Sequence, residues 1–339
     1  MTPLPPIERF QSNTGARIYR IPVLAFPGLI AFCYILLEAG VPTLIDTGSG
    51  IADSNDQLLE GIASLKSLFN EPIGLHDLKR IIITHGHIDH FGGLGFMQEQ
   101  TGAEVAVHRL DRRVLTNYEE RVLVASKDVS VYLERAGVKP ELRANLMMMY
   151  GFAKKQFRSV NVDISLEDGM ELDGMKFVHT PGHCSGQVCI ILGDVLISAD
   201  HVLARITPHQ SPESITRYTG LGHYLESLKT VSRIDGLRLA LGGHEEPIHE
   251  VYDRIDAIRE SHQRKLERVT EAIRSAEAPC TVSEISKAIY PDRYGYDVLL
   301  ALEEIGAHVE YLYEHGMLAV ANLDDLERED NPALRYTLA

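Results

Sequence analysis

Six consecutive residues, His85 to His90, combine three histidines and one aspartate in the order His-Gly-His-Ile-Asp-His. They follow a run of three isoleucines, Ile81 to Ile83, which predicts a buried strand that ends just before the first histidine. Imidazole nitrogens and carboxylate oxygens are good ligands for zinc and iron. The density of these side chains therefore favours a metal site over a polar surface turn, which is the alternative for so short a segment.

Three more candidate ligands follow expected strands later in the chain. His183 ends a Thr-Pro-Gly-His turn, Asp200 follows the segment Ile197-Ser198-Ala199, and His244 follows two glycines. Taken alone, each fits an ordinary capping or surface residue at the end of a strand. Four such sites in this order are a more specific signal, and together they predict one constellation of metal ligands.

The combined motifs HGHIDH, TPGH, SAD and GGH, opened by Leu44-Ile45-Asp46-Thr47-Gly48, resemble the metallo-β-lactamase superfamily of hydrolases. The resemblance implies an α+β fold, a four-layer αββα sandwich of two mixed sheets with helices outside. It also implies two divalent metal ions, with zinc favoured and iron or manganese as alternatives. By the resemblance, the ligands of the first ion would be His85, His87 and His183; those of the second would be Asp89, His90 and His244; Asp200 would bridge the two ions. Asp46 would steady the ligand loops.

The resemblance further implies hydrolysis by a hydroxide that bridges the two ions, with Asp89 and Asp200 as catalytic residues that tune the metal charge and orient the nucleophile. The best-known β-lactamases have a cysteine where this chain has Asp200, and a carboxylate there is typical of thioesterases, lactonases and phosphodiesterases. We therefore expect a small-molecule acyl substrate, namely a thioester, ester or lactone. A phosphodiesterase or endoribonuclease is the alternative. A binding protein with a vestigial metal site is disfavoured because every ligand is present.

Residues outside the ligand set are assigned by position. Four residues that follow Asp200 could contact the substrate or lie in an ordinary surface loop: Arg205, His209, Tyr218 and Tyr224. Residues 111–158 show helical periodicity and include Met147-Met148-Met149-Tyr150-Gly151-Phe152. We expect a helical insertion over the site, with adaptable methionine and aromatic side chains, although such a stripe is also typical of plain core packing.

The elements that must position the ligands follow from hydrophobic periodicity and turn residues. Strands are expected at Arg17–Val23, Ala31–Glu38, Pro42–Ile45, Leu78–Thr84, Glu104–His108, Asp163–Ser165, Met175–His179, Val188–Leu192, Val195–Ser198 and Arg238–Leu241. Helices are expected at Ile51–Phe69, Phe91–Thr101, Gly222–Val231 and His249–Ala276. Strands that alternate with helices and end at ligand-bearing loops are typical of a rigid catalytic scaffold.

The chain divides into four expected parts. Residues 1–250 form the catalytic domain, 251–278 a connecting helix, 279–322 a small winged-helix-like module, and 323–339 an acidic tail. The layout resembles the β-lactamase-like endoribonucleases and two-domain bacterial hydrolases. The second helix of the module carries acidic residues (Asp297, Glu303, Glu304 and Glu310). The module is therefore expected to serve a homodimer or a substrate pocket rather than DNA.

Composition narrows the classes of partner. The net charge of −15 argues against a general nucleic-acid-binding protein. The four cysteines form no CxxC pair, which fits reduced thiols and a cytoplasmic location. The start Met1-Thr2-Pro3-Leu4-Pro5-Pro6 lacks the features of a signal peptide, and the apolar segment Ile21–Leu37 is too short and broken to span a bilayer. No membrane partner is expected.

Overall fold

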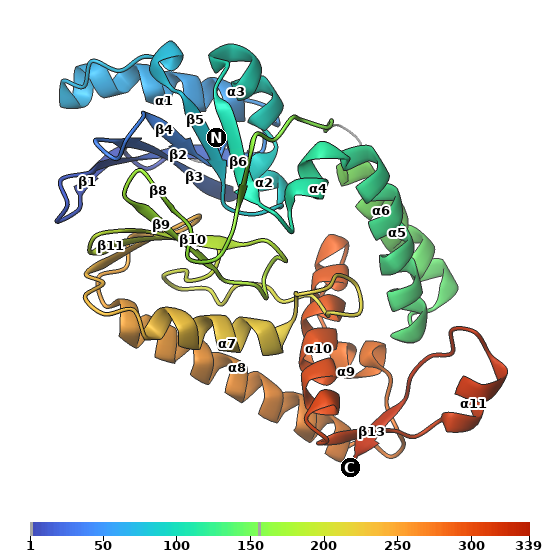
Figure 1. The fold of residues 1–339 in the computed structure, drawn as a ribbon. Coiled ribbons are helices and arrows are strands. Elements are labelled where there is room, and N and C mark those ends of the chain that lie inside the picture. Colours follow the sequence, from blue (N-terminus) through green and yellow to red (C-terminus); the bar gives the residue numbers. More distant parts are fainter. Residues whose placement is uncertain (1–2, 155–156) are drawn as a thin grey trace. The chain divides into compact units, whose positions relative to one another are not determined.

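The computed structural model of the chain describes residues 3–154 and 157–339 (Figure 1). Our expectations for Met1, Thr2 and the Phe152 side chain lie outside the described residues. The chain forms two compact units. Unit 1 comprises Met1–Tyr118, Arg158–Pro208 and Ser227–Ile255; unit 2 comprises Glu119–Phe157, His209–Glu226 and Asp256–Ala339. Both are therefore built from segments that are far apart in the sequence.

The first sheet of unit 1 has seven strands in sequential order. They are β1 (Glu8–Gln11), β2 (Arg17–Phe26), β3 (Leu29–Leu37), β4 (Thr43–Ile45), β5 (Arg80–Ile83), β6 (Glu104–His108) and β7 (Ile164–Leu166). The first four pair antiparallel, and β2 turns into β3 at Gly28, whose φ of 82° suits a tight turn. From β4 to β7 the pairing is parallel. Parallel pairing brings the carboxyl ends of β4 and β5 to the same edge of the sheet.

The second sheet of unit 1 has five strands in the order β12-β11-β10-β9-β8. Their bounds are β8 (Glu171–Leu172), β9 (Met175–His179), β10 (Val188–Leu192), β11 (Val195–Ala199) and β12 (Leu239–Gly242). Strands β11 and β12 are parallel, so Asp200 and His244, which follow them, leave the sheet at the same edge. The remaining pairs are antiparallel.

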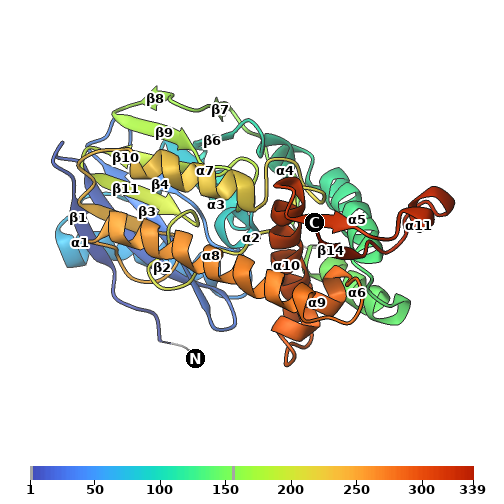
Figure 2. The same cartoon turned by 90° about the horizontal axis from the view of Figure 1, so that it is seen from below.

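The two sheets pack face to face across one apolar core. Side chains from both, such as Tyr34 and Ile82 of the first and Phe177 and Ile197 of the second, belong to one cluster and are almost fully buried. Helices α1 (Ser54–Phe69) and α3 (Leu94–Thr101) cover the outer face of the first sheet (Figure 1). The parts of α7 (Leu221–Ser232) and α8 (Val251–Arg274) in unit 1 cover the second (Figures 1 and 2). This arrangement confirms the expected αββα sandwich.

One local difference concerns the helix expected to begin at Phe91. A short helix, α2 (Ile88–Phe91), ends there, and α3 begins only at Leu94. The break falls at Gly92 and Gly93, where a Cβ on Gly93 would lie 2.5 Å from the carbonyl oxygen of Thr47. The two glycines therefore let the chain that follows β4 approach the ligand-bearing helix closely.

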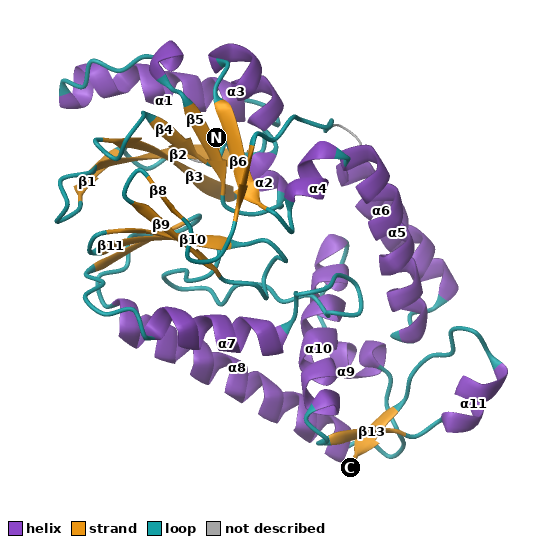
Figure 3. Ribbon diagram, in the orientation of Figure 1, coloured by secondary structure: helices purple, strands orange, loops and turns teal. Residues whose placement is uncertain are grey.

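Unit 2 is mostly helical (Figure 3). It contains α5 (Tyr118–Arg135) from Glu119 onward, α6 (Pro140–Lys154), α9 (Val282–Ile289), α10 (Tyr296–Glu314) and α11 (Leu323–Arg328), with the strands β13 (Leu318–Val320) and β14 (Tyr336–Leu338). The N-cap of α9 is Thr281, which forms a capping box with Glu284. The short helices η1 (Leu75–Asp77) and α4 (Arg112–Thr116) belong to unit 1.

Helix α10 is the central element of unit 2. Every residue from Ala301 to Val309 is buried, which covers more than two helical turns and hence all faces of the helix. Around it pack α5, α6, α9 and the β13–β14 pair, whose side chains share one apolar cluster. In the part of the chain that the structure describes, no helix is long and apolar enough to cross a membrane.

Candidate metal centre

Each expected ligand follows the carboxyl end of a strand in unit 1. His85 and His87 lie in the loop after β5. Asp89 and His90 lie in α2, the short helix that follows this loop. The remaining three, His183, Asp200 and His244, follow β9, β11 and β12. The structure brings the ligand atoms of all seven residues into two groups, within each of which the atoms lie no more than 4.8 Å apart.

The first group consists of His85, His87 and His183. The Nε2 atom of His85 lies 3.1 Å from Nδ1 of His87, while the ring centroids are only 4.7 Å apart and nearly perpendicular. The two nitrogens therefore do not point straight at each other. They point toward a common position beside the line that joins the ring centroids, as two ligands of one metal ion do. Burial, together with His90 and His87, holds the pKa of His85 well below its usual range, so its lone pair is available to a cation.

The second group consists of Asp89, His90, Asp200 and His244. His244 Nε2 lies 3.3 Å from a carboxylate oxygen of Asp89 and 3.3 Å from one of Asp200. Burial opposes charge on His244, but the neighbouring Asp200 and Asp89 raise its pKa to about 10. In the same way, Asp200, Asp46 and Asp89 outweigh burial and raise the pKa of His90 well above its usual value. The carboxylates of Asp89 and Asp200 thus stabilise positive charge at this site, and a divalent ion would supply that charge in place of protons.

Asp200 lies within reach of both groups. Its Oδ1 is 3.5 Å from His90 Nε2, and its Oδ2 is 3.7 Å from His183 Nε2. Although Asp200 is buried, which would raise a carboxyl pKa, His244 and His90 lower it well below the usual value. Its Oδ1 and the Nε2 of His90 are buried and make no hydrogen bond with any residue that the structure describes. Buried nitrogen and oxygen atoms that converge without hydrogen bonds are the donor set that a divalent metal requires, so the residues fit the implied ions.

Asp46 and Thr84 hold the ligands from behind. The Oδ2 atom of Asp46 accepts hydrogen bonds from His90 Nδ1 and Thr84 Oγ1, each at 2.8 Å, and its Oδ1 accepts one from the Thr84 amide. Because the Thr84 hydroxyl donates to Asp46, it accepts from Nδ1 of His85 at 3.1 Å. Asp46 therefore orients His90 directly and His85 through Thr84, which leaves the Nε2 atoms of both histidines for the metal.

Sequence reasoning missed Thr84 and the purpose of Gly243. In the sequence, Thr84 is simply the last residue of an expected strand. A Cβ on Gly243 would lie 2.5 Å from Cε1 of His90 and closer still to Oδ1 of Asp200. The Gly-Gly pair before His244 is a visible signal, but by itself it indicates only a loop. Gly243 is what allows the two ligands to approach this backbone.

The four expected substrate residues have different surroundings. Arg205, in unit 1, is 70% exposed and forms ion pairs with Glu245 and Glu246. The other three belong to unit 2. His209 pairs with Glu303 at 3.2 Å, Tyr218 is 45% exposed, and Tyr224 is fully buried with its ring 5.3 Å from that of His262. Substrate contact by these residues stays a prediction.

Unit 2 contains a third group of possible ligands, His262, Glu304 and His308. His262 Nδ1 lies 3.1 Å from His308 Nε2, the same separation as in the His85–His87 pair, but here the ring centroids are 5.2 Å apart. The nitrogens therefore point at one another, as in a direct N–H···N hydrogen bond. The Lys265 ammonium also pairs with Glu304. This hydrogen bond and the neighbouring Lys265 cation favour a buried hydrogen-bonded pair over a metal site.

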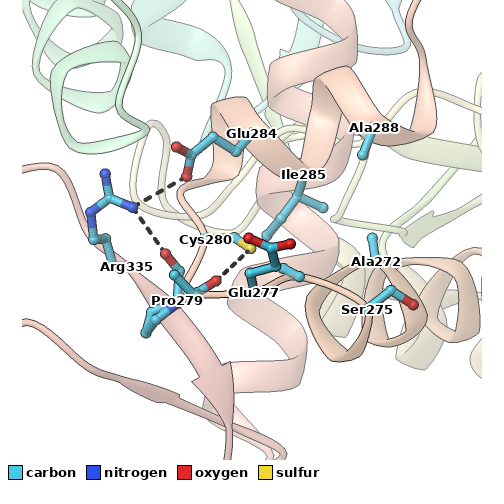
Figure 4. Close-up of a pocket in the computed structure, with 11 residues that line it drawn as sticks. Ala272, Ser275, Glu277, Pro279, Cys280, Glu284, Ile285, Ala288 and Arg335 are labelled. Atoms are coloured by element: carbon cyan, nitrogen blue, oxygen red, sulfur yellow. Dashed lines mark hydrogen bonds and ion pairs between the residues drawn. The ribbon is translucent and has the colours of Figure 1, made fainter.

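Unit 2 also has a surface cavity with a mostly apolar lining that includes the charged side chains of Glu277, Glu284 and Arg335 (Figure 4). The positively charged residue in this lining is Arg335. Its guanidinium donates a hydrogen bond to the carbonyl oxygen of Pro279 at 2.9 Å and lies 3.4 Å from the Glu284 carboxylate. Because the guanidinium already has these acceptors and the cavity also contains Glu277, it offers little to an anionic ligand.

Comparison with known proteins decides the family. The sequence model of the metallo-beta-lactamase superfamily matches residues 27–272, which include all seven ligand candidates. The chain belongs to the metallo-β-lactamase superfamily. This confirms the resemblance that the sequence motifs carried.

Relatives and solved structures agree with this assignment. The probable metallo-hydrolase YqjP of Bacillus subtilis is 23% identical over 287 residues, covering 82% of this chain and 86% of its own. The Beta-lactamase-like protein 2 homolog of Caenorhabditis elegans is 23% identical, covering 84% and 79%. A metallo-beta-lactamase family protein from Thermus thermophilus has a TM-score of 0.75 at 25% identity, covering 95% and 98%. A Beta-lactamase domain protein from Burkholderia ambifaria has a TM-score of 0.73 at 23% identity, covering 98% and 94%.

As a member of this superfamily, the chain is a metal-dependent hydrolase. Both solved structures match nearly the full length, so the similarity in fold includes unit 2. A winged-helix identity for residues 279–322 stays a prediction.

Proposed function

We propose that this protein is a dinuclear hydrolase that acts on a small thioester, ester or lactone. The proposal rests on the position of the Asp200 carboxylate between the two ligand groups. Its two carboxylate oxygens face both ligand groups, at 3.5 Å from His90 and 3.7 Å from His183. A carboxylate at this position distinguishes the chain from those superfamily members that have cysteine there, and it directs the proposal away from β-lactams.

The ligand residues divide the work between two ions. His85, His87 and His183 would hold the first ion, Asp89, His90 and His244 the second, and Asp200 both. When bound, such ions lower the pKa of water toward neutrality and polarise the electrophilic oxygen of a substrate. The mixed imidazole and carboxylate set is suited to zinc.

The protein residues determine the direction of approach. Among the seven ligands, only His87 and Asp89 are partly exposed, whereas the other five are buried. A substrate would therefore reach the centre from the side of these two residues. There Asp89 would orient the nucleophile: His90 and His244 outweigh burial and lower its pKa, so it stays an acceptor at neutral pH.

Two features support an uncharged or weakly charged acyl substrate over nucleic acid. The net charge of −15 opposes polyanions. Helix α10, which would be the recognition helix of a winged module, is buried on all faces from Ala301 to Val309 and has no open face there for a nucleic-acid groove. The cysteines of the chain are free thiols, which supports a cytoplasmic location as part of the proposal.

The test is a panel of thioesters, esters and lactones, run beside single-stranded RNA, with protein whose metal content has been measured. We expect hydrolysis in at least one acyl class, with two zinc ions per chain. His87→Ala should lower the activity by about 10–100-fold or more through loss of metal. His76→Ala removes an exposed histidine of η1 and should leave activity unchanged. Inertness toward every acyl class, with salt-sensitive RNA cleavage that His87→Ala abolishes, would favour the phosphodiesterase alternative.

A further inference from the structure

A buried carboxylate outside the ligand motifs joins two of the ligand loops. Asp111 is only 1% exposed. Its Oδ2 accepts a hydrogen bond from the Gly86 amide at 2.7 Å and one from the Cys184 thiol at 3.2 Å. Its Oδ1 accepts one from the Gly186 amide at 2.9 Å. Asp111 is also the N-cap residue of α4, yet its side chain makes no cap hydrogen bond within that described helix. The Asp111 carboxylate therefore binds the loops after β5 and β9 and does not cap α4.

The donors to Asp111 belong to the loops of the first ligand group. Gly86 lies between His85 and His87, and Cys184 follows His183 directly. One carboxylate thus spans the two segments from which all three histidines of that group come. The loops of Asp200 and His244 supply none of these three donors.

The spacing between these segments is tight. A Cβ on Gly186 would lie 2.5 Å from Cγ of Asp111 and 2.7 Å from its backbone nitrogen. Nearby, the rings of His108 and His179 stack with centroids 4.0 Å apart, and His179 Nε2 lies 2.8 Å from the carbonyl oxygen of Ser185. The end of β9 and the loop that follows it therefore contact the segment 108–111 at His108 and at Asp111. Of these two residues, Asp111 also accepts a hydrogen bond from the β5 loop.

We propose that Asp111 is a positioning residue for the first metal site, where it sets the distance between His183 and the pair His85 and His87. Asp46 gives the contrast. It supports His90 of the second group directly and His85 of the first through Thr84. Loss of Asp46 should weaken both sites, whereas loss of Asp111 should weaken the first site alone. The inference rests on the proposed two-metal centre but not on the acyl substrate.

The test measures metal binding and needs no substrate. Apoprotein is titrated with Co²⁺, and each affinity and the absorption spectrum of each bound ion are recorded. In Asp111→Asn the amide nitrogen opposes one backbone donor, so we expect the affinity for one ion to fall about 10–100-fold and the other to be unchanged. The lost spectral component should be the one that His87→Ala removes. In the double variant, Asp111→Asn should add nothing to His87→Ala.

Two further variants keep the test decisive if Asp111→Asn folds poorly. Gly186→Ala keeps the carboxylate but pushes the same loop away, and it should weaken the same ion. Cys184→Ala deletes one of the three bonds and should lower the same affinity only a few-fold. The matched control is Asp163→Asn, because Asp163 also accepts a backbone hydrogen bond, but from Val105 of β6 and not from a ligand loop.

The outcomes separate the two proposals. Equal weakening of both ions in Asp111→Asn, or unchanged affinity for both, would overturn the positioning role. Wild-type protein that binds only one Co²⁺ would instead contradict the proposed two-metal function. Excess metal should restore the activity of Asp111→Asn on whichever substrate the wild-type protein hydrolyses, since the ligands themselves are intact.

Discussion

Gly243→Ala adds a single methyl group and should disable the metal centre. The added methyl group would lie 2.5 Å from Cε1 of His90, whereas ordinary contact begins at 3.4 Å, so a neighbour must move by roughly 1 Å. The backbone cannot retreat easily, because the Gly243 amide donates to the Ala199 carbonyl at 2.9 Å and its own carbonyl accepts from Phe32 at 2.8 Å. The displacement therefore falls on His90 and Asp200.

The size of the expected loss in metal affinity follows from the narrow range of metal–ligand distances. Ligand distances tolerate only about 0.2 Å, so a shift of roughly 1 Å should lower the affinity for the second ion on the order of 10–100-fold, and the displacement of Asp200 should weaken the first ion as well. A misplacement of this size also reduces turnover by about 100-fold. Overpacking should lower the free energy of unfolding by about 1–3 kcal/mol.

The assay compares metal content, calorimetric unfolding and hydrolysis for wild type, Gly243→Ala and Gly95→Ala. In Gly95→Ala, the control in α3, the nearest atom to the new methyl group is 3.5 Å away, and we expect normal metal binding. Wild-type affinity for both ions in Gly243→Ala would refute the reasoning, since it would mean that His90 and Asp200 do not have to lie where the structure places them.

Three further predictions concern pH and metal. Burial opposes protonation of His209, but Glu303 and Glu304 raise its pKa to about 9, so its stabilising contribution is complete below pH 6.5 and is lost as pH rises toward 9. Chemical unfolding of His209→Gln should therefore show a flatter alkaline limb than wild type. Burial, with His179 and Arg109, lowers the pKa of His108 to about 3, so its contribution is complete above pH 6.5 and declines by at most about 1.4 kcal/mol per pH unit as pH falls toward 3. His108→Gln should flatten that acid limb, and an unchanged slope would contradict the assignment. Removal of metal by a chelator should lower the melting temperature, because ions present at 100 times their Kd stabilise the fold by about 2.7 kcal/mol; identical melting curves would show that no ion binds the native state.

The sandwich could be predicted from the sequence because its signals are local. The isoleucines that lead to His85 and the turn at Pro27-Gly28 mark strands and their ends without reference to the rest of the chain. The strands that were not expected, β1, β8 and β14, are short and depend on a partner strand. Strand β14 lies in the segment expected to be an acidic tail, where Tyr336 is buried through the pairing of β14 with β13 and a backbone bridge to Cys280. Strand pairing between segments that are distant in the sequence produces no recognisable hydrophobic periodicity.

The same distinction applies to the metal centre. His183 and Asp200 follow recognisable motifs, so they could be assigned by residue type and order. Asp111 and Thr84 act through hydrogen bonds to neighbours, and an aspartate at the start of a helix looks the same whether it caps that helix or binds a loop 73 residues away. Such contacts are set by the pairing of strands and by the packing of the two sheets, which residue type alone does not encode.

The order of the ligands along the chain determines when the centre can form during synthesis. His85 to His90 emerge early, but the second group needs His244, which follows the last strand of the second sheet. Until that strand pairs with β11, Asp200 and Asp89 lack one of their partners. Completion of the second metal site is therefore a late event that requires a finished sandwich, and a chain truncated before β12 would carry every ligand except His244 without a complete centre.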